Sequence, residues 1–468
     1  MENKKLSSGI ITVLIANVCN LGFSVLTSFL LPKYLSVETY AAIKTYQLYI
    51  GYIGLLHLGY VDGIYIKNGG RRFDEISRVE LSKSLATLRV LQMLIMSVFL
   101  GICVFYRDTT FIAFTLAILP INMAAYFQML FQSIGEFKRY SVLIRATTIA
   151  TFIVNMVLLL LFRTDLKIYY LSAYVILSYI IWFVLEQNVR SLYKEKFELF
   201  AFDKNEIVVN VKSGLLLTLG NLSSSLFTGM DRWFVKILMT TFDFAQYSFA
   251  VSIEHFVNVA LNPVSITLYN YFCRHDESKQ IIKIRRYVLI FATIVIAAAF
   301  PAKFIMEHFL TAYIEASRII FLLFSAQIFY FTIKSIYVNL YKARKKQNIY
   351  FMKLIVSIAA GAIFNMVFYY LMRCREAFAV GTVFSSIFWW VLCLPDFKEI
   401  KYRLNEILYM FIELIAYNFC GIGFNSIIGF CIYVPFTVIM MLVFLRYDVM
   451  MLFGIGKTML ISKFRRIR

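Results

Sequence analysis

The chain has 468 residues, of which 60% are hydrophobic and 16% are charged, and its formal net charge is +20. Its mean hydropathy is +0.73. Soluble domains are about half apolar and about one quarter charged. The composition therefore excludes a soluble globular protein and predicts a chain that folds with lipid as its solvent.

Long apolar segments follow one another along most of the chain. Because a membrane-spanning helix needs about 20 mostly apolar residues, the sequence predicts an all-α integral membrane protein with about 14 transmembrane helices. The predicted spans are 9–31, 43–66, 84–106, 111–133, 141–162, 168–188, 213–238, 246–270, 287–306, 318–341, 351–372, 377–394, 406–424 and 426–445. Only "GIGFNS" separates the last two, so twelve spans are the alternative if this pair is a re-entrant hairpin.

The N-terminal stretch "MENKKLSSGIITVLIANVCNLGFSVLTSFLL" has basic residues followed by an apolar run, as a signal peptide does. The run is longer than the apolar region of a signal peptide, and it lacks a clear small-x-small cleavage site. We interpret it as the first retained span.

Lys and Arg gather in alternate loops. With a cytoplasmic N-terminus, roughly thirty of them lie in inner segments and fewer than about ten in outer loops, as the positive-inside rule requires. The inner segments are "KNGGRRFDEISRVELSK", "GEFKRY", 189–212, "CRHDESKQIIKIRR", "KARKKQN", "PDFKEIKYR" and "GKTMLISKFRRIR". The basic residues thus set the topology and meet anionic headgroups, with both termini cytoplasmic, and they do not indicate nucleic-acid binding.

Cysteine and histidine give no sign of a metal site. The seven cysteines are scattered, mostly inside apolar runs and without C-x-x-C spacing, and the four histidines form no cluster. We interpret the cysteines as small buried hydrophobic residues. The sequence therefore predicts neither a metal nor a cofactor.

An internal duplication relates two parts of the chain. "RATTIATFIVNMVLLLLF" at 145–162 resembles "IVSIAAGAIFNMVFYYLM" at 355–372, and at an offset of 210 residues Asn155 corresponds to Asn365. Two six-span halves make a parallel repeat, which places a binding cavity between them. We expect a six-helix lobe over 1–200, a second over 201–400, and an extra helix pair with a basic cytoplasmic tail over 401–468, the two lobes being related by a pseudo-two-fold axis.

Ionisable residues remain inside the apolar windows. Each costs about 3 kcal/mol at the bilayer centre on insertion scales, so these side chains should face protein or water. The candidates for substrate binding or gating are Lys44, Asp62, Arg145, Asp231, Arg232, Lys236, Glu254 and Lys334. Arg89, Lys353 and Glu413 also lie in apolar windows, the first two near inner ends where they would snorkel to the headgroups.

Helical spacing groups some of these residues. Lys44 and Asp62 are 18 residues apart, about five turns at 3.6 residues per turn, which predicts one face of the second span. Arg232 and Lys236 also share a face, and two like charges there require an anion between them. That anion is either a carboxylate such as Glu254 or a phosphate of the ligand.

Structural roles are the alternatives for several residues. Asp62 could cap its helix end before "KNGG", and Lys236 could snorkel to the outer surface. Asn155 and Asn365 are expected to make hydrogen bonds between helices. Asp231 and Arg232 are adjacent and near mid-span, so a functional or gating role is favoured for them. Cations outnumber carboxylates in the spans, which favours an anionic ligand, and the aromatic residues suit sugar rings or a lipid tail.

Several motifs together resemble a known family. "PKYLSVETYAAIKTYQLYIGYIGLLHLGYVDGIYIKNGG" (32–70) resembles the second-span pattern of bacterial polysaccharide flippases, with its Gly-hydrophobic-Asp-Gly turn. "GNLSSSLFTGMDRWFVKILMTTFDFAQYSFAVSI" (220–253) is similar to their seventh-span pattern, and "FLTAYIEAS" and "NLYKARKKQNIY" to later stretches. These are the O-antigen and capsule (Wzx-type) flippases of the multidrug/oligosaccharidyl-lipid/polysaccharide exporter superfamily.

The resemblance implies two six-helix bundles around a central cationic cavity, plus two further helices, in the bacterial cytoplasmic (inner) membrane. It implies alternating access and transfer of a polyprenyl-diphosphate-linked glycan to the outer leaflet. Implied partners are this substrate, membrane lipid, and a glycan polymerase or other assembly proteins. Asp62, Asp231 and Arg232 match the family's motifs, whereas the second-half counterpart of the Asp62 turn, "ALNPVSITLYN", has no carboxylate.

Three other functions are the alternatives. A drug exporter of the same superfamily would favour cationic substrates and a cavity richer in acids. A membrane glycan polymerase, glycosyltransferase or acyltransferase would need a large outer loop, an acidic metal-binding pair or an intramembrane His. The outer loops here are short and no D-x-D occurs, so we expect no enzyme. A structural scaffold would leave so many buried charges unexplained.

Overall fold

The structure, a computed structural model, describes residues 21–193, 198, 200–275, 277–452 and 454. Within these residues every regular element is a helix, so the all-α prediction is confirmed. Residues 9–20 of the first predicted span and 455–468 of the basic tail lie outside the described residues.

Eleven helical stretches of the described chain are long and apolar enough to cross a membrane. They are Arg78–Tyr106, Thr109–Ser133, Arg139–Leu161, Lys167–Ser191, Thr241–Tyr269, Ser278–Phe309, Ala316–Ala343, Gln347–Met372, Glu376–Ile400, Leu404–Gly423 and Ser426–Phe444. Each coincides with a predicted span. Of the other three, 9–31 is described only from residue 21, 43–66 is broken, and 213–238 belongs to the longer helix α8.

The chain forms two compact units, Met1–Thr228 and Gly229–Arg468. The first contains α2 (Val37–Ile50), η1 (Ile53–His57), α3 (Tyr60–Lys67), η2 (Phe73–Glu75), α4 (Arg78–Tyr106), α5 (Thr109–Ser133), α6 (Phe137–Met156), η3 (Val157–Leu161), α7 (Lys167–Tyr193) and most of α8 (Lys204–Leu238). The boundary therefore falls inside α8, 28 residues beyond the predicted boundary at 200.

The second unit continues from the end of α8. It contains α9 (Thr241–Glu254), α10 (Val257–Phe272), α11 (Ser278–Ile296), α12 (Ala299–Phe309), η4 (Thr311–Tyr313), α13 (Ala316–Thr332), η5 (Ile333–Tyr337), α14 (Val338–Ala343), α15 (Gln347–Met372), α16 (Glu376–Cys393), η6 (Leu394–Ile400), α17 (Leu404–Gly423) and α18 (Ser426–Phe444). The pair α17 and α18 packs within this unit, against α12 and α13.

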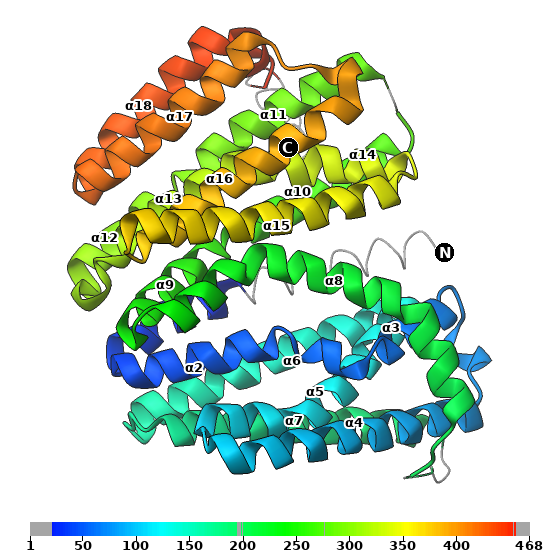
Figure 1. The fold of residues 1–468 in the computed structure, drawn as a ribbon. Coiled ribbons are helices and arrows are strands. Elements are labelled where there is room, and N and C mark those ends of the chain that lie inside the picture. The colour runs from blue at the N-terminus through cyan, green and yellow to red at the C-terminus, as the bar shows by residue number, and fades with distance from the viewer. Residues whose placement is uncertain (1–20, 194–197, 199, 276, 453, 455–468) are drawn as a thin grey trace, which may run out of the picture. The chain divides into compact units, whose positions relative to one another are not determined.

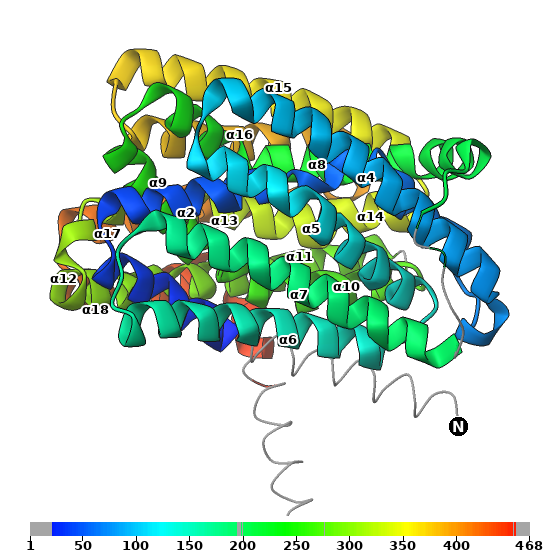
Figure 2. The ribbon, with the colours of Figure 1, turned by 90° about the horizontal axis from the view of Figure 1, so that it is seen from below.

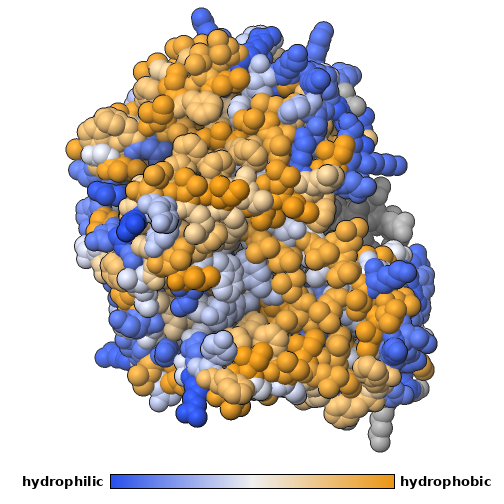
Figure 3. Space-filling view, in the orientation of Figure 1, coloured by the Kyte–Doolittle hydropathy of each residue, from blue (hydrophilic) through white to orange (hydrophobic). Residues whose placement is uncertain are grey.

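Long helices lie side by side within each unit (Figures 1 and 2). Hydrophobic residues cover most of the surface of each unit in the view of Figure 3, and hydrophilic residues gather toward the helix ends. Apolar side chains on the outside and polar helix ends are what a bilayer selects. The chain is accordingly a multi-pass membrane protein.

The second predicted span is not one helix. After α2 the chain forms the short helix η1, and Leu58 (φ 53°) and Gly59 (φ 87°) are both left-handed before α3 begins. This change of direction requires a residue that tolerates positive φ, and Gly59 supplies it. The prediction that Lys44 and Asp62 share one continuous helical face is therefore wrong.

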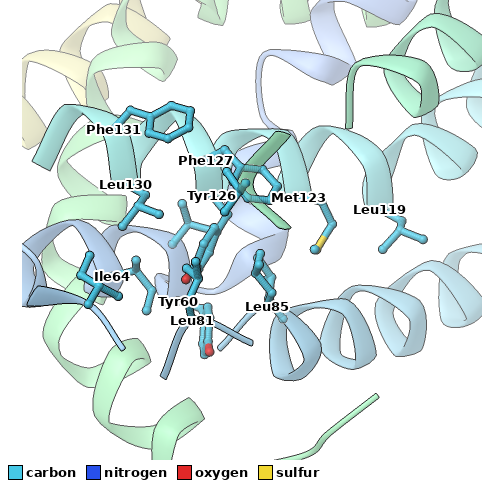
Figure 4. Close-up of a cluster of buried hydrophobic side chains, with 14 residues drawn as sticks. Tyr60, Ile64, Leu81, Leu85, Leu119, Met123, Tyr126, Phe127, Leu130 and Phe131 are labelled. Carbon is cyan, nitrogen blue, oxygen red and sulfur yellow. The ribbon is translucent and has the colours of Figure 1, made fainter. Parts of the chain in front are cut away.

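Apolar side chains from three helices form a core in the first unit (Figure 4). Tyr60 and Ile64 of α3 pack with Leu81 and Leu85 of α4 and with a stripe on α5 that includes Tyr126. The Tyr60 hydroxyl donates to the Ser84 carbonyl at 3.1 Å. The core thus fixes the short helix α3, and with it Asp62, against two long helices.

Backbones of α3 and α8 approach each other closely at glycines. A Cβ at Gly63 would overlap the backbone of Asn210, and one at Gly214 would overlap backbone atoms of Gly59 and Gly63. No side chain can yield there, because the obstructing atoms are main chain. This contact holds α8 against the broken second span.

The two cations predicted to snorkel, Arg89 and Lys353, form ion pairs. Arg89 pairs with Glu186 of α7 and lies 5.7 Å from the Trp182 ring. Lys353 lies 2.6 Å from Asp396. The snorkelling prediction for both is therefore wrong: each ammonium or guanidinium finds a carboxylate of its own unit.

An ionic network joins α11, α17 and Asp448 at one end of the second unit. The fully buried Arg285 of α11 pairs with Glu406 of α17 and stacks 3.7 Å from the Tyr402 ring centroid. Arg286 lies 2.8 Å from Glu406 and 3.3 Å from Asp448. Breaking such a buried group leaves an uncompensated charge, so the network specifies how α17 docks on α11.

Gly214→Ala should destabilise the first unit by about 3 kcal/mol, because the added methyl overlaps main-chain atoms of the second span. Gly101→Ala on α4 is the matched control, since a Cβ there meets nothing within 4 Å. It should be neutral or slightly stabilising, because Ala has the higher helix propensity. Thermal melting of both variants in micelles measures the difference; equal melting temperatures would contradict the close packing.

Candidate substrate-binding site

Four of the eight predicted site residues meet in the second unit. Asp231 and Arg232 are on α8, Glu254 ends α9, and Lys334 lies in η5. The carboxylate of Glu254 is in electrostatic range of the other three. Two carboxylates and two cations thus form one group, hereafter the unit-2 network.

Asp231 is held by donors from three places. Its carboxylate accepts hydrogen bonds from the Tyr247 hydroxyl at 2.7 Å, from the Arg232 backbone N–H at 2.8 Å, and from the Thr382 hydroxyl at 3.5 Å. The side chain is 6% exposed. Donors of this kind compensate the lost hydration of a buried carboxylate, so α9 and α16 fix its position.

Glu254 lies where the ninth helix breaks. His255 and Phe256 separate α9 from α10, and the Gln327 side chain of α13 donates to the Glu254 carboxylate. Gln327 itself is buried. The acid is therefore fixed between a helix end and the most enclosed helix of the unit.

Lys334 lies in a π-helical turn, Ile333–Tyr337, between α13 and α14. Single π-turns are frequent at functional sites, since they re-aim a side chain. The Ser265 hydroxyl of α10 donates to the Lys334 carbonyl at 3.2 Å, and Asn339 donates to the Ser265 carbonyl at 2.7 Å. The ammonium lies 5.4 Å from the Tyr330 ring.

One N–H donor of the Arg232 guanidinium is buried and has no acceptor in the described residues. Within the described part of the chain, its Nε has no hydrogen-bond partner although the atom is buried. A buried N–H of this kind costs free energy unless a partner is supplied. Its orientation in the unit-2 network therefore suits an anionic or hydroxyl-bearing ligand.

Lys236 lies one turn beyond Arg232 on α8. Its ammonium is 5.0 Å from the Phe244 ring, whereas the charges acting on Glu254 are those of Lys334, Asp231 and Arg232. The structure therefore places Glu254 with Arg232 and does not show it between Arg232 and Lys236.

Asp62 lies in the first unit, in the first turn of α3. It accepts a hydrogen bond from the Thr218 hydroxyl of α8, and its carboxylate is 4.0 Å from Nε2 of His57. Negative charge in a first turn is stabilised by the helix dipole. Asp62 therefore stabilises the start of α3; the alternative that it caps the end before "KNGG" is wrong.

Lys44 and Arg145 also belong to the first unit. Lys44 of α2 donates to Gln47 at 3.2 Å and lies 5.3 Å from the Tyr40 ring. Arg145 of α6 donates to the Ser141 carbonyl of its own helix at 3.3 Å. Neither is seen with Asp62, so the predicted residues of this unit form separate contacts.

A cavity of about 320 Å³ lies inside the first unit. Its lining includes the polar side chains of Gln47, Gln128, Thr147, Thr151 and Ser178, from α2, α5, α6 and α7. Lys44 adjoins it through Gln47. The rest of its lining is mainly apolar and includes Pro120, Ile121 and Leu177.

The two asparagines of the duplication behave differently. The Tyr174 hydroxyl of α7 donates to Asn155 of α6 at 2.6 Å, so the predicted interhelical hydrogen bond is confirmed. Asn365 donates to the Gly361 carbonyl of its own helix at 2.8 Å, so the same prediction is wrong there.

Tyr247, Thr382, Thr218 and His57 were missed from the sequence as partners of the two aspartates. A hydroxyl in an apolar span carries no sign of which distant helix it faces. Tyr247 lies in the stretch 220–253 that resembles the seventh-span pattern, and its hydroxyl makes the shortest hydrogen bond to Asp231.

Comparison with known proteins shows the fold. No family model matches the sequence, and no curated protein matches it. The lipid II flippase MurJ in an inward-closed conformation has a TM-score of 0.61 at 15% identity, covering 95% of this chain and 99% of that chain. Two MATE transporters are similar in fold as well.

An inward-facing multidrug resistance MATE transporter of the MOP superfamily has a TM-score of 0.53 at 12% identity, covering 86% of this chain and 95% of that chain. The eukaryotic MATE transporter AtDTX14 has a TM-score of 0.50 at 13% identity, covering 89% and 98%. The chain has the fold that MurJ and these MATE transporters share, as the superfamily resemblance predicted.

Tyr247→Phe should lower the free energy of unfolding by about 2 kcal/mol, because a buried carboxylate loses a donor. In an Asp231→Asn background the same change should cost much less, since an amide needs the hydroxyl less. Chemical denaturation of the four proteins in micelles gives the coupling. A coupling near zero would show that the hydroxyl does not stabilise the Asp231 carboxylate.

Proposed function

We propose that this protein is a flippase that moves a polyprenyl-diphosphate-linked oligosaccharide from the cytoplasmic to the outer leaflet by alternating access. The observation that carries the proposal is the pair of partly buried cations in the unit-2 network, Arg232 and Lys334. Cations at membrane depth cost free energy, and an anionic ligand would offset part of that cost.

Balanced charge in the unit-2 network suggests how the ligand is bound and released. Asp231 and Glu254 compensate Arg232 and Lys334 when no substrate is bound. A diphosphate would compete with Glu254 for Lys334 and supply the missing acceptor to Arg232. Binding is then an exchange of partners, which costs less than desolvating unpaired cations and leaves the group stable after release.

The physical task fits the fold. A diphosphate and its sugar hydroxyls cannot cross about 30 Å of hydrocarbon unaided. In repeat-built transporters one bundle rocks against another around a binding site near the midplane. A structural likeness to the lipid II flippase MurJ supports a lipid-linked substrate. The proposed setting is the bacterial inner membrane, with cytoplasmic termini and a glycan polymerase or another assembly protein receiving the product.

Multidrug export is the second candidate. The MATE likeness supports it, and Asp231 with Glu254 would suit a cationic drug. A deletion strain that becomes sensitive to cationic dyes, with no accumulation of lipid-linked glycan, would favour this function. Accumulated lipid-linked glycan without dye sensitivity would favour the flippase.

Replacing Arg232 and Lys334 together by Gln should abolish translocation of lipid-linked glycan without lowering the protein level. The reason is that the diphosphate loses its cationic partners. Proteoliposomes containing the glycan lipid give the readout, as the fraction that an added lectin reaches.

Arg274→Gln with Lys279→Gln is the control, because both cations are exposed near an inner helix end. It removes positive charge without touching the unit-2 network, and its translocation should match wild type. Wild-type translocation by the Arg232→Gln, Lys334→Gln variant would refute the assignment of these cations.

A further inference from the structure

A second site lies on the first unit, in a groove between α6 and α7. The groove has a volume of about 820 Å³. One wall is a helical stripe on α6 that includes Leu143, Ala146 and Ala150, and the other is a stripe on α7 that includes Leu177 and Val184. The small side chains of Ala146 and Ala150 leave the room between the helices.

Most of the polar residues that line this groove lie at one end, with Thr147 between the two alanines as the exception. Glu136 and Arg139 are at the start of α6, and Asn188 and Ser191 are near the end of α7. In the orientation predicted from the positive-inside pattern, both are inner ends. The groove therefore has a polar mouth at the depth of the inner headgroups and apolar walls above it.

The length of the groove along α6 matches the thickness of one leaflet. Arg139 and Ala150 are eleven residues apart on α6, which is about 16 Å at 1.5 Å per residue. Half of a hydrocarbon core of about 30 Å is about 15 Å. The groove thus accommodates a chain that runs from an inner headgroup to the bilayer midplane.

Arg139 is positioned for a phosphate. Its guanidinium lies 5.2 Å from the Phe73 ring and its Nε is 3.5 Å from Glu136. Its side chain is 40% exposed, and a pair between such exposed groups is weak. A phosphate can take the remaining N–H edge in the planar geometry that arginine favours.

The groove adjoins the smaller cavity of the first unit. Thr147, Leu177 and Ile181 line both spaces, and most of the lining of both is apolar. A long polyprenyl chain held in the groove therefore has further apolar surface beside it.

We propose that the groove between α6 and α7 binds the carrier lipid of the substrate in the inner leaflet, with its phosphate on Arg139 and its polyprenyl chain along Ala146 and Ala150. The inference rests on the proposed flippase function and names where the substrate's lipid docks before transfer. The probe is a radiolabelled polyprenyl monophosphate, bound to the full chain in phosphatidylcholine nanodiscs.

Ala146→Trp combined with Ala150→Trp fills the groove, and Arg139→Gln removes the phosphate partner. Each should weaken binding of the probe at least about tenfold. Ile153→Trp is the matched control: it is 53% exposed on the same helix, beyond the groove lining, and should bind like wild type. Melting temperatures of all variants check that the fold is kept.

Three outcomes would overturn the proposal. Groove variants could bind the probe as wild type does. Phosphatidylglycerol could displace the probe at equal concentration, which would make the groove a place for any anionic lipid. The tryptophan variant could change the oligomeric state in micelles, which would make a second copy of this chain the occupant.

The lectin assay separates this inference from the proposed function. If wild type translocates glycan and the groove variants do so equally, the groove fails and the function stands. If wild type translocates nothing while the groove variants still lose the probe, the function fails and the lipid site stands.

Discussion

The cost of placing charge in hydrocarbon determines where the informative residues of this protein lie. A lone ion at the bilayer centre is unfavourable by about 3 kcal/mol on insertion scales, so each one found there must be compensated. Asp231 has three donors, Arg89 has Glu186, and Lys353 has Asp396. In the unit-2 network two carboxylates and two cations compensate one another, and Nε of Arg232 has no acceptor in the described residues. Nε of Arg285 is in the same position within an ion pair, so the presence of both signs of charge in one group is what favours a binding role for the unit-2 network.

Irregular backbone accompanies these charges. Lys334 lies in a π-turn, Glu254 at the break between α9 and α10, and Asp62 just after the left-handed Leu58 and Gly59. Non-helical backbone at membrane depth is tolerated only where other groups satisfy it. Ser265 satisfies the carbonyl of Lys334, and the Gly59 N–H is bonded to Nδ1 of His57 at 3.2 Å. Polar side chains and helix breaks therefore occur at the same places, because the backbone groups left free at a break need polar partners.

The sequence predicts the helices of this fold well and its contacts poorly. Hydropathy located the spans, since the bilayer imposes their length, and it gave Asp231 and Arg232 as residues too deep to be incidental. It wrongly made 43–66 one helix, because glycine is common in membrane spans and the sequence does not show that Leu58 and Gly59 adopt left-handed backbone. It wrongly assigned snorkelling to Arg89, because Glu186 is 97 residues away. Which side chains pair across helices depends on tertiary packing, and a local sequence pattern carries no information about that packing.

Glu413 shows how the distinction between structural and functional charge can be made. It is fully buried in α17, accepts from the Thr437 hydroxyl of α18 at 2.9 Å, and has one oxygen with no partner in the described chain. Among the described residues no cation lies within ion-pair distance of it, and tyrosines of the same helix pair are its neighbours, with the ring centroids of Tyr417 and Tyr433 5.2 Å apart. Its hydrogen bond to Thr437 joins α17 to α18, which is a structural role. Asp231 and Glu254, by contrast, lie with Arg232 and Lys334, and only a group with both signs of charge can exchange partners with a phosphate.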